Sequence, residues 1–332
     1  MSIVKINQKN NKPKYRQIIE SIEDAISHGE LKMGDQLPSL NLIKDKHSIS
    51  RDTVLSAFNE LKNRGIIDST VGKGYYVTSE NIQVQTKVFI LFDELNAFKE
   101  DLYNSLLKHL GDTVQVDVYF HHFNRNFFED IIRRHLDSYT YYIIMPANLD
   151  GIESHINLLK QDKVFILDQM RPELSKYSAV FQDFENDVCK GLKRLQSGIK
   201  KYKNFKLIYS SKKQPLGILK GFKNFCKSQQ IRHQVLPEFN ENLIYKGDLF
   251  FVLEDKHLIL IIKKMKEKGF TLAEDYGIIS YNESILKEII EGGITTISTD
   301  FKLMGKQLSE MILQNKKGQI PNINRVKIRK SL

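Results

Sequence analysis

Residues 13–77 read PKYRQIIESIEDAISHGELKMGDQLPSLNLIKDKHSISRDTVLSAFNELKNRGIIDSTVGKGYYV and contain three short signals in a fixed order. The signals are GDQLPS at residues 34–39, SRDTV at residues 50–54 and GKGYYV at residues 72–77. Each is weak alone, but their order and spacing are typical of a helix-turn-helix followed by a β-wing. Such a unit places one helix in the major groove of DNA, so we predict a DNA-binding head.

Local signals predict the three helices of this head. Apolar residues recur at three- and four-residue steps over residues 15–26, which indicates one buried helical face, and Gly29 ends that helix. Ser39 is placed to cap a short second helix. Ser50 is placed to cap a third helix, which Gly65 closes. The first turn of the third helix is then exposed, as it is in a recognition helix.

The wing is predicted from two short apolar runs, residues 66–67 and 75–77, on either side of Gly72-Lys73-Gly74. The glycines permit a tight reversal, and Lys73 at its tip is suited to a DNA phosphate. A nucleotide-binding loop is the other interpretation of this tripeptide. We reject it because no helix follows whose N-terminus could hold a phosphate.

The candidate DNA-contacting residues lie around these signals. Ser50, Asp52 and Thr53 have a second interpretation, in which they only cap the third helix. The basic arm of residues 1–16 could lie along a phosphate backbone or be a solubilising tail. The candidates are Ser39, Asn41, Ser50, Arg51, Asp52, Thr53, Lys73 and Gly74.

On these residues the head resembles the winged-helix domain of GntR-family transcription regulators. Leu37-Pro38-Ser39, residues 50–54 and Gly72-Lys73-Gly74 match that family's pattern position by position. The resemblance implies sequence-specific contact with double-stranded operator DNA. Asn41 departs from the pattern, because the family usually has a DNA-contacting arginine there.

Length and composition indicate how the chain divides into domains and where the protein resides. With 332 residues, two domains are expected: a winged helix-turn-helix at 1–78, a linker at 79–86 and a second domain at 87–332. The net charge of +10 is not concentrated in the head, since residues 1–80 hold 12 Lys and Arg against 10 Asp and Glu. Two cysteines, no signal peptide and no apolar run of 18 residues predict a cytoplasmic protein with no membrane contact.

Known catalytic patterns do not match the sequence. His121-His122 lack a third ligand at metal spacing, and we interpret them as loop or surface residues. No Gly-x-Ser-x-Gly elbow, Walker loop or HExxH motif is present. We therefore expect no enzyme activity, no cofactor and no metal.

Beyond residue 86, strand-like and helix-like segments alternate, which predicts α/β architecture with parallel sheets and helices on both faces. The alternation runs from 88 to 167 and repeats from 206 to 280. Two such halves form a cleft, and ligands in these folds bind at the carboxyl ends of the strands.

This part resembles the two-lobed, periplasmic-binding-protein-like sensor domain of LacI-type regulators over roughly residues 87–330. The resemblance implies a sugar effector and a homodimer that reads a pseudo-palindromic operator. Its landmarks, in chain order, are residues 92–98, 164–168 and 180–183, the Gly221-Phe222 pair, Asp255, residues 277–282 and 294–300, and the Met304-Gly305 pair.

Polar residues at predicted strand ends are the candidate effector ligands, because carboxylates and amides bind vicinal hydroxyls and an aromatic face covers a sugar ring. Each could instead be a helix cap or turn former, and Phe98 could be a core residue. The resemblance places Asp183 and Asn282 most directly. The candidates are Asp93, Asn96, Phe98, Asp168, Gln169, Asp183, Lys213, Glu254, Asp255 and Asn282.

Ile218 stands where the resembled family often has an arginine that grips sugar hydroxyls, and Lys213, Gln214 or Lys220 could replace it. The loss of arginine disfavours a phosphosugar, since arginine captures phosphate in a bidentate manner. We expect a repressor of a sugar-utilisation operon that a neutral fucose- or arabinose-like monosaccharide releases. A regulator that senses a phosphosugar or nucleotide, and a DNA-headed enzyme, are the alternatives.

Overall fold

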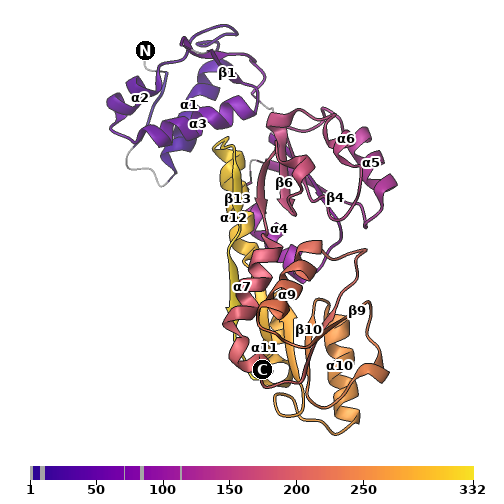
Figure 1. Ribbon diagram of the computed structural model, residues 1–332. Coiled ribbons are helices and arrows are strands. Elements are labelled where there is room, and N and C mark those ends of the chain that lie inside the picture. Colours follow the sequence, from indigo (N-terminus) through magenta and orange to yellow (C-terminus); the bar gives the residue numbers. More distant parts are fainter. Residues whose placement is uncertain (1–2, 8–11, 71, 83–85, 113) are drawn as a thin grey trace.

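The computed structural model describes residues 3–7, 12–70, 72–82, 86–112 and 114–332, which form a head and a two-lobed body (Figure 1). The head lies at one end of the molecule, the N-terminal lobe of the body in the middle, and the C-terminal lobe at the far end. The mixed α/β class expected from the alternation of segments is confirmed.

The head is a three-helix unit with a two-stranded wing, and its side chains form one core of their own. Ser39 and Ser50 cap their helices as the sequence predicts, because their hydroxyls accept the backbone N–H of Leu42 and Thr53. Gly65 follows the third helix with a positive φ of 71°. The elements are α1 (Lys14–Ser27), α2 (Leu40–His47), α3 (Arg51–Asn63), β1 (Ile67–Thr70) and β2 (Gly74–Val77).

Residues 3–7 of the basic arm pack along α1. Val4 is buried in the head core, and the backbone N–H groups of Lys5 and Asn7 donate to Ser21 and Gln17 of α1. This segment is therefore not a free tail, and its contact with a phosphate backbone stays a prediction. Lys9 lies outside the described residues.

The N-terminal lobe contains a six-stranded parallel sheet in the order β13-β7-β6-β5-β3-β4. Helix α4 and the late helix α12 pack together on one face of it. The elements contributed before the first crossing are β3 (Thr86–Phe92), α4 (Ala97–Leu110), β4 (Val114–Phe120), α5 (Arg125–Arg134), β5 (Tyr141–Ile144), α6 (Glu153–Ile156), β6 (Val164–Asp168) and β7 (Ser178–Phe181).

The C-terminal lobe repeats this plan with the strand order β14-β12-β11-β10-β8-β9, in which only β14 is antiparallel. Helices α7 and α9 pack side by side over one face of the sheet. Its elements are α7 (Phe184–Arg194), α8 (Gln196–Ile199), β8 (Asn204–Ile208), α9 (Leu216–Ser228), β9 (His233–Leu236), β10 (Asp248–Val252), α10 (Asp255–Glu267), β11 (Gly277–Tyr281), α11 (Ile285–Ile289), β12 (Thr295–Thr299) and β14 (Asn324–Lys327).

The chain crosses between the lobes three times, so the two halves are not contiguous in sequence as the alternation suggested. After β12 it returns to the N-terminal lobe as α12 (Phe301–Leu313) and β13 (Gln319–Pro321), then crosses back to β14. Asn322 joins the crossings, because its side-chain amide donates to Thr299 Oγ1 and the Asp300 carbonyl at 2.9 Å each. Its backbone N–H donates to the Phe181 carbonyl at 2.7 Å.

The head contacts the body through the C-terminal end of α12. Asn59 and Asn63 of α3 donate from Nδ2 to the carbonyls of Gln314 (3.1 Å) and Ile312 (3.4 Å). The connecting segment 79–82 also packs on the head, where Arg64 donates to the Ile82 carbonyl at 2.6 Å. Of the predicted linker, residues 83–85 lie outside the described chain, and Thr86 already belongs to β3.

Candidate functional site

The first turn of α3 presents two free side chains. Ser50 Oγ accepts the Thr53 N–H at 3.1 Å and lies 2.7 Å from Thr53 Oγ1, so these two hydroxyls are engaged with each other. Arg51 and Asp52 are exposed and form no ion pair within the described residues. The capping interpretation thus accounts for Ser50 and Thr53, while Arg51 and Asp52 remain available to a partner.

The wing presents Lys73 in the same way. The flanking Gly72 and Gly74 have φ of 75° and 107°, values that side-chain-bearing residues rarely adopt. Gln36 Nε2 donates to the Lys73 carbonyl at 2.6 Å and so fixes the turn against the head. The Lys73 side chain is exposed, with no ion pair in the described chain, and Asn41 on α2 is exposed as well.

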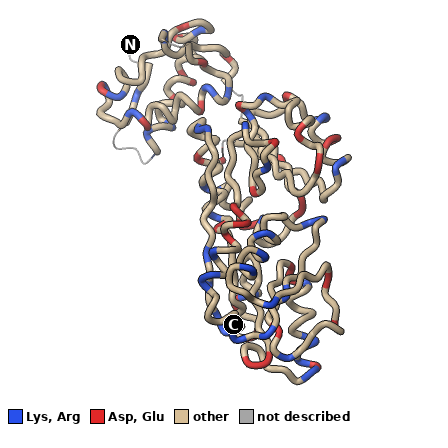
Figure 2. The backbone as a smooth tube through the Cα atoms, viewed as in Figure 1, with Lys and Arg blue, Asp and Glu red and all other residues tan. Residues whose placement is uncertain are grey.

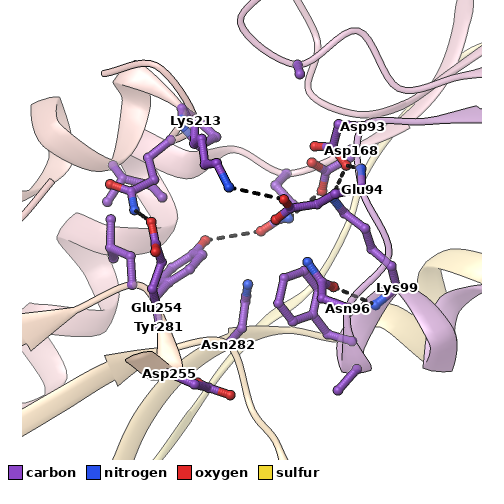
Figure 3. A pocket seen from close by; sticks show the side chains of 18 of the residues that line it. Asp93, Glu94, Asn96, Lys99, Asp168, Lys213, Glu254, Asp255, Tyr281 and Asn282 are labelled. Atoms are coloured by element: carbon purple, nitrogen blue, oxygen red, sulfur yellow. Dashed lines mark hydrogen bonds and ion pairs between the residues drawn. The ribbon is translucent and has the colours of Figure 1, made fainter. Parts of the chain in front are cut away.

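A cavity of about 350 Å³ lies between the two lobes of the body. Its walls are the carboxyl ends of β3, β6 and β11 and the loops that follow β8 and β10 (Figure 3). Nine of the ten candidate effector ligands line it: Asp93, Asn96, Phe98, Asp168, Gln169, Lys213, Glu254, Asp255 and Asn282.

Asp183 is the candidate that does not line the cavity. Its carboxylate caps α7, accepting the Asn186 backbone N–H at 3.4 Å and the Asn186 side-chain amide at 2.7 Å. The neighbouring Gln182 faces the cavity in its place. Gln182 Nε2 donates to Asp168 Oδ1 at 2.5 Å, and Gln182 Oε1 accepts from Tyr281 OH at 3.1 Å.

Two carboxylates and one lysine form the charged centre of the N-terminal wall. Lys99, which is buried, is ion-paired with Asp93. Asp168 lies in the same group, and desolvation raises its pKa to about 6, an effect that Asp93 strengthens and Lys99 opposes. Asp168 also has φ of 73°, an uncommon conformation outside glycine that is found more often at functional sites.

The C-terminal wall presents an amide without a partner. Asn282 is 8% exposed, and its Oδ1 makes no hydrogen bond within the described residues. The side chain projects into the cavity, between walls contributed by the two lobes (Figure 3). Because a buried polar atom without a partner costs free energy, the arrangement favours a ligand that donates a hydrogen bond there.

Polar contacts already connect the two walls. Lys213 of the C-terminal lobe lies 3.3 Å from Glu94 of the N-terminal lobe, as Figure 3 shows. Asn148 donates from Nδ2 to the Gln214 carbonyl at 2.7 Å. Gln214 Nε2 in turn donates to Glu254 Oε1 at 2.9 Å. The walls therefore hold each other through side chains of both lobes.

The described cavity lining is acidic overall. Six of its side chains are carboxylic acids, four are lysines and none is an arginine. Two of the lysines are committed within the protein: Lys99 pairs with Asp93, and Lys287 donates to the carbonyls of Tyr281 and Asn282 at 2.9 and 2.8 Å. Burial lowers the pKa of Lys287. A phosphate group would meet more negative than positive charge.

Several lining residues were not predicted from the sequence. Gln182 and Lys287 lie beside predicted strand ends but had no pattern of their own, whereas Gln214, one of the three predicted substitutes for the missing arginine, does line the cavity. Ile218, at the position of the missing arginine, is buried and lines the cavity, whereas Lys220 is exposed and does not. His121-His122 lie in the loop after β4, as one of the two interpretations expected, but His121 is not at the surface: its ring is fully buried and lies 3.0 Å from the Met145 carbonyl.

Within residues 3–7, 12–70, 72–82, 86–112 and 114–332, no group of three or more His, Cys, Asp or Glu side chains is arranged to hold a metal ion. None of the helices in those ranges has the length and apolarity needed to cross a bilayer.

Comparison with known proteins identifies the head. The profile of bacterial regulatory proteins of the gntR family matches residues 14–77. The transcriptional repressor YtrA of Bacillus subtilis (strain 168) is 31% identical over 100 residues, which are 30% of this chain and 73% of that protein. The chain belongs to the GntR family of transcription regulators.

Three further relatives match this chain over 75–84 residues, and one matches it over nearly its whole length. Matches to three further curated regulators cover 16–35% of those proteins, so the chain spans about a third of their length or less. The arabinose metabolism transcriptional repressor of Geobacillus stearothermophilus is 21% identical over 343 residues, 91% of each chain.

The fold of the body also has solved counterparts. A LacI family transcriptional regulator from Enterococcus faecium, solved with bound ribose, aligns with a TM-score of 0.60 at 21% identity over 74% of this chain and 98% of that one. This likeness shows the fold, the two-lobed architecture of LacI-type regulators.

Proposed function

We propose that the protein is a DNA-binding transcription repressor whose effector is a small neutral monosaccharide of arabinose type. One observation carries the proposal: in a chain with a GntR head, nine polar or aromatic side chains from both lobes converge on one cavity. Its size suits one sugar ring, and its unpartnered Asn282 Oδ1 suits a hydroxyl donor.

The charge of the cavity supports a neutral ligand over a phosphosugar or nucleotide. Carboxylates outnumber lysines, and the exposed Lys213 is already paired with Glu94. The relative from Geobacillus stearothermophilus is an arabinose metabolism repressor, which supports a pentose. Arabinose is therefore the first sugar to test, with fucose second.

A homodimer in the cytoplasm is part of the same proposal, because two heads are needed to read two half-sites about one helical turn apart. The C-terminal lobe carries exposed isoleucines on α11 and beside β14, at Ile285, Ile289, Ile323 and Ile328. A second copy would cover this apolar surface. Sedimentation of the purified chain should show a dimer.

Calorimetry on the full chain tests the effector. We expect L-arabinose or L-fucose to bind, and arabinose 5-phosphate and nucleotides not to bind. An operator selected from random duplex DNA should then be released by the same sugar in a gel-shift titration. Tight binding of the phosphosugar with no binding of any neutral sugar would contradict the proposal.

A further inference from the structure

The positive charge of this protein lies far from its DNA-binding head. Residues 184–232 contain 13 Lys and Arg against two Asp and Glu, a net charge of +11, whereas the other 283 residues carry a net −1. This segment forms α7, α8 and α9 with the strand β8, all within the C-terminal lobe. Figure 2 shows blue residues gathered along this lobe, at the end of the molecule opposite the head.

Six of these cations form one surface, which we call the basic face. Helices α7 and α9 approach closely, because a Cβ on Gly221 would lie 2.5 Å from the Glu185 carbonyl oxygen. The inner sides of both helices are buried in the lobe core, so their charged sides point outward together. The basic face consists of Lys190, Lys193 and Arg194 on α7 and Lys220, Lys223 and Lys227 on α9.

The cations of the basic face are not in salt bridges within the described residues, although Lys190 interacts electrostatically with Asp187 on the same helix. All six side chains are exposed, and none forms a salt bridge within the described residues. Within the whole 184–232 segment, the salt bridges found in the described chain are Lys206–Asp248 and Lys213–Glu94. Some exposed lysines elsewhere are paired, as Lys246 is with Asp275 and Lys266 with Glu291, but the basic face gathers six unpaired cations on two adjacent helices. Uncompensated charge of one sign on one surface attracts a polyanion.

The composition of the basic face fits nucleic acid better than protein. The exposed residues among the lysines are polar, such as Gln196, Ser197 and Asn224. Protein interfaces have apolar, aromatic centres depleted in lysine, whereas protein–DNA interfaces are polar and strongly positive. Lysine is a point charge that meets phosphate without reading bases.

We propose that the basic face binds the phosphate backbone of duplex DNA without sequence preference, at a site separate from the winged-helix head. Because the N-terminal lobe lies between them, the two sites contact different stretches of DNA (Figure 1). A chain held by its head on one segment could then hold a second, flanking segment through α7 and α9. This contact goes beyond operator recognition and does not depend on the identity of the effector.

The test measures binding of the full chain to random-sequence duplex DNA as a function of salt. The head is first weakened with Arg51→Ala and Lys73→Ala, so that the basic face contributes a larger share of the remaining affinity. Lys190→Gln, Lys193→Gln, Lys220→Gln and Lys223→Gln are then added together. Each phosphate contact contributes about 0.9 to the slope of log K against log salt. The four substitutions should therefore reduce the slope by about 3 to 4 and weaken binding at least tenfold.

A matched control separates this contact from net charge. The control neutralises four exposed lysines on other surfaces, Lys108, Lys160, Lys176 and Lys263, all to Gln. The proposal expects little change in slope for the control, with melting temperatures preserved in both variants. Equal losses of slope in both variants, or no DNA binding by the chain with the weakened head, would overturn it. An unchanged slope with loss of self-association would assign the face to a second copy instead.

Discussion

In the head, Arg51 and Lys73 are exposed and lack ion pairs in the described chain, whereas in the cleft Lys99 is paired with Asp93 and Lys213 with Glu94. Arg51 and Lys73 can therefore contact a partner without first breaking an ion pair within the described chain. The cleft side chains are held by one another, so a ligand must exchange some of these contacts. Substitutions in the head should change binding alone, and substitutions in the cleft should change stability as well.

The largest effect is expected at Asp168. Its raised pKa means that the ionised carboxylate destabilises the native state at neutral pH. Its native pKa of about 6 exceeds the usual value near 3.9, so the folded chain binds more protons between these pH values. Its contribution therefore lowers stability as pH rises from about 4 to 6. Asp168→Asn should remove this loss and stabilise the ligand-free body by about 3 kcal/mol at pH 7.

Urea unfolding at pH 4 and pH 7 measures this effect as a difference from the unmodified chain. The same substitution at the exposed Asp150 is the control and should change little. A constant difference between the Asp168 variant and the parent at both pH values would show that the carboxylate is not desolvated. The conclusion that substitutions in the cleft change stability would then lose its main support.

The next effect is expected at Arg51, on the head side of the comparison. Arg51→Ala should weaken operator binding by about 1–3 kcal/mol, because a direct contact with guanine or phosphate is lost. Since Arg51 forms no ion pair within the described residues, the melting temperature should not change. Gel-shift titration beside Arg134→Ala, an exposed arginine of the N-terminal lobe, measures it. Unchanged operator affinity would remove Arg51 from the interface.

A smaller effect is expected at Asn282, a cleft residue that resembles the head surface because its Oδ1 atom has no partner in the described chain. Asn282→Gly keeps the positive φ of 62° without strain and removes only the amide. Loss of one or two hydrogen bonds should weaken sugar binding by about 1–2 kcal/mol and leave operator affinity unchanged. Calorimetry with the sugar measures the change. Full sugar affinity in this variant would show that the free Oδ1 atom is not a ligand contact.

The smallest effect is expected at Lys73, whose contact should be with phosphate. Lys73→Ala should weaken operator and random DNA alike and reduce the salt slope by about one. Titration of both DNAs at several salt concentrations measures the slope. Loss of affinity for the operator alone would mean that the wing reads bases, and the head would then have two sequence-reading elements.

The head could be predicted from sequence because its signals are local. Ser39 and Ser50 act within three residues of themselves, and Gly72 and Gly74 set a turn by their own φ values. The cleft could be predicted in part, because the carboxyl ends of the strands meet at one edge of a parallel sheet. This rule located Asp93, Asp168 and Asn282.

The assignment of late elements to one sheet or the other could not be predicted from the sequence. The periodicity of residues 301–313 indicates a helix but not its return to the N-terminal lobe, which follows from Gly305 fitting closely against α4. Strands β13 and β14 are short and polar, so they had no alternation to detect. Gln182 acquires its role only from partners in other segments, namely Asp168 and Tyr281.

The attachment of the head has a consequence for signalling. The head touches the body at Ile312 and Gln314 of the α12 end, and the chain enters the body at β3. Both points belong to the N-terminal lobe, so we expect the head to follow that lobe if an effector closes the cleft. Closure within an isolated chain would leave its half-site contacts unaltered. Only a paired chain, joined through the C-terminal lobes, could convert closure into a new distance between the two recognition helices.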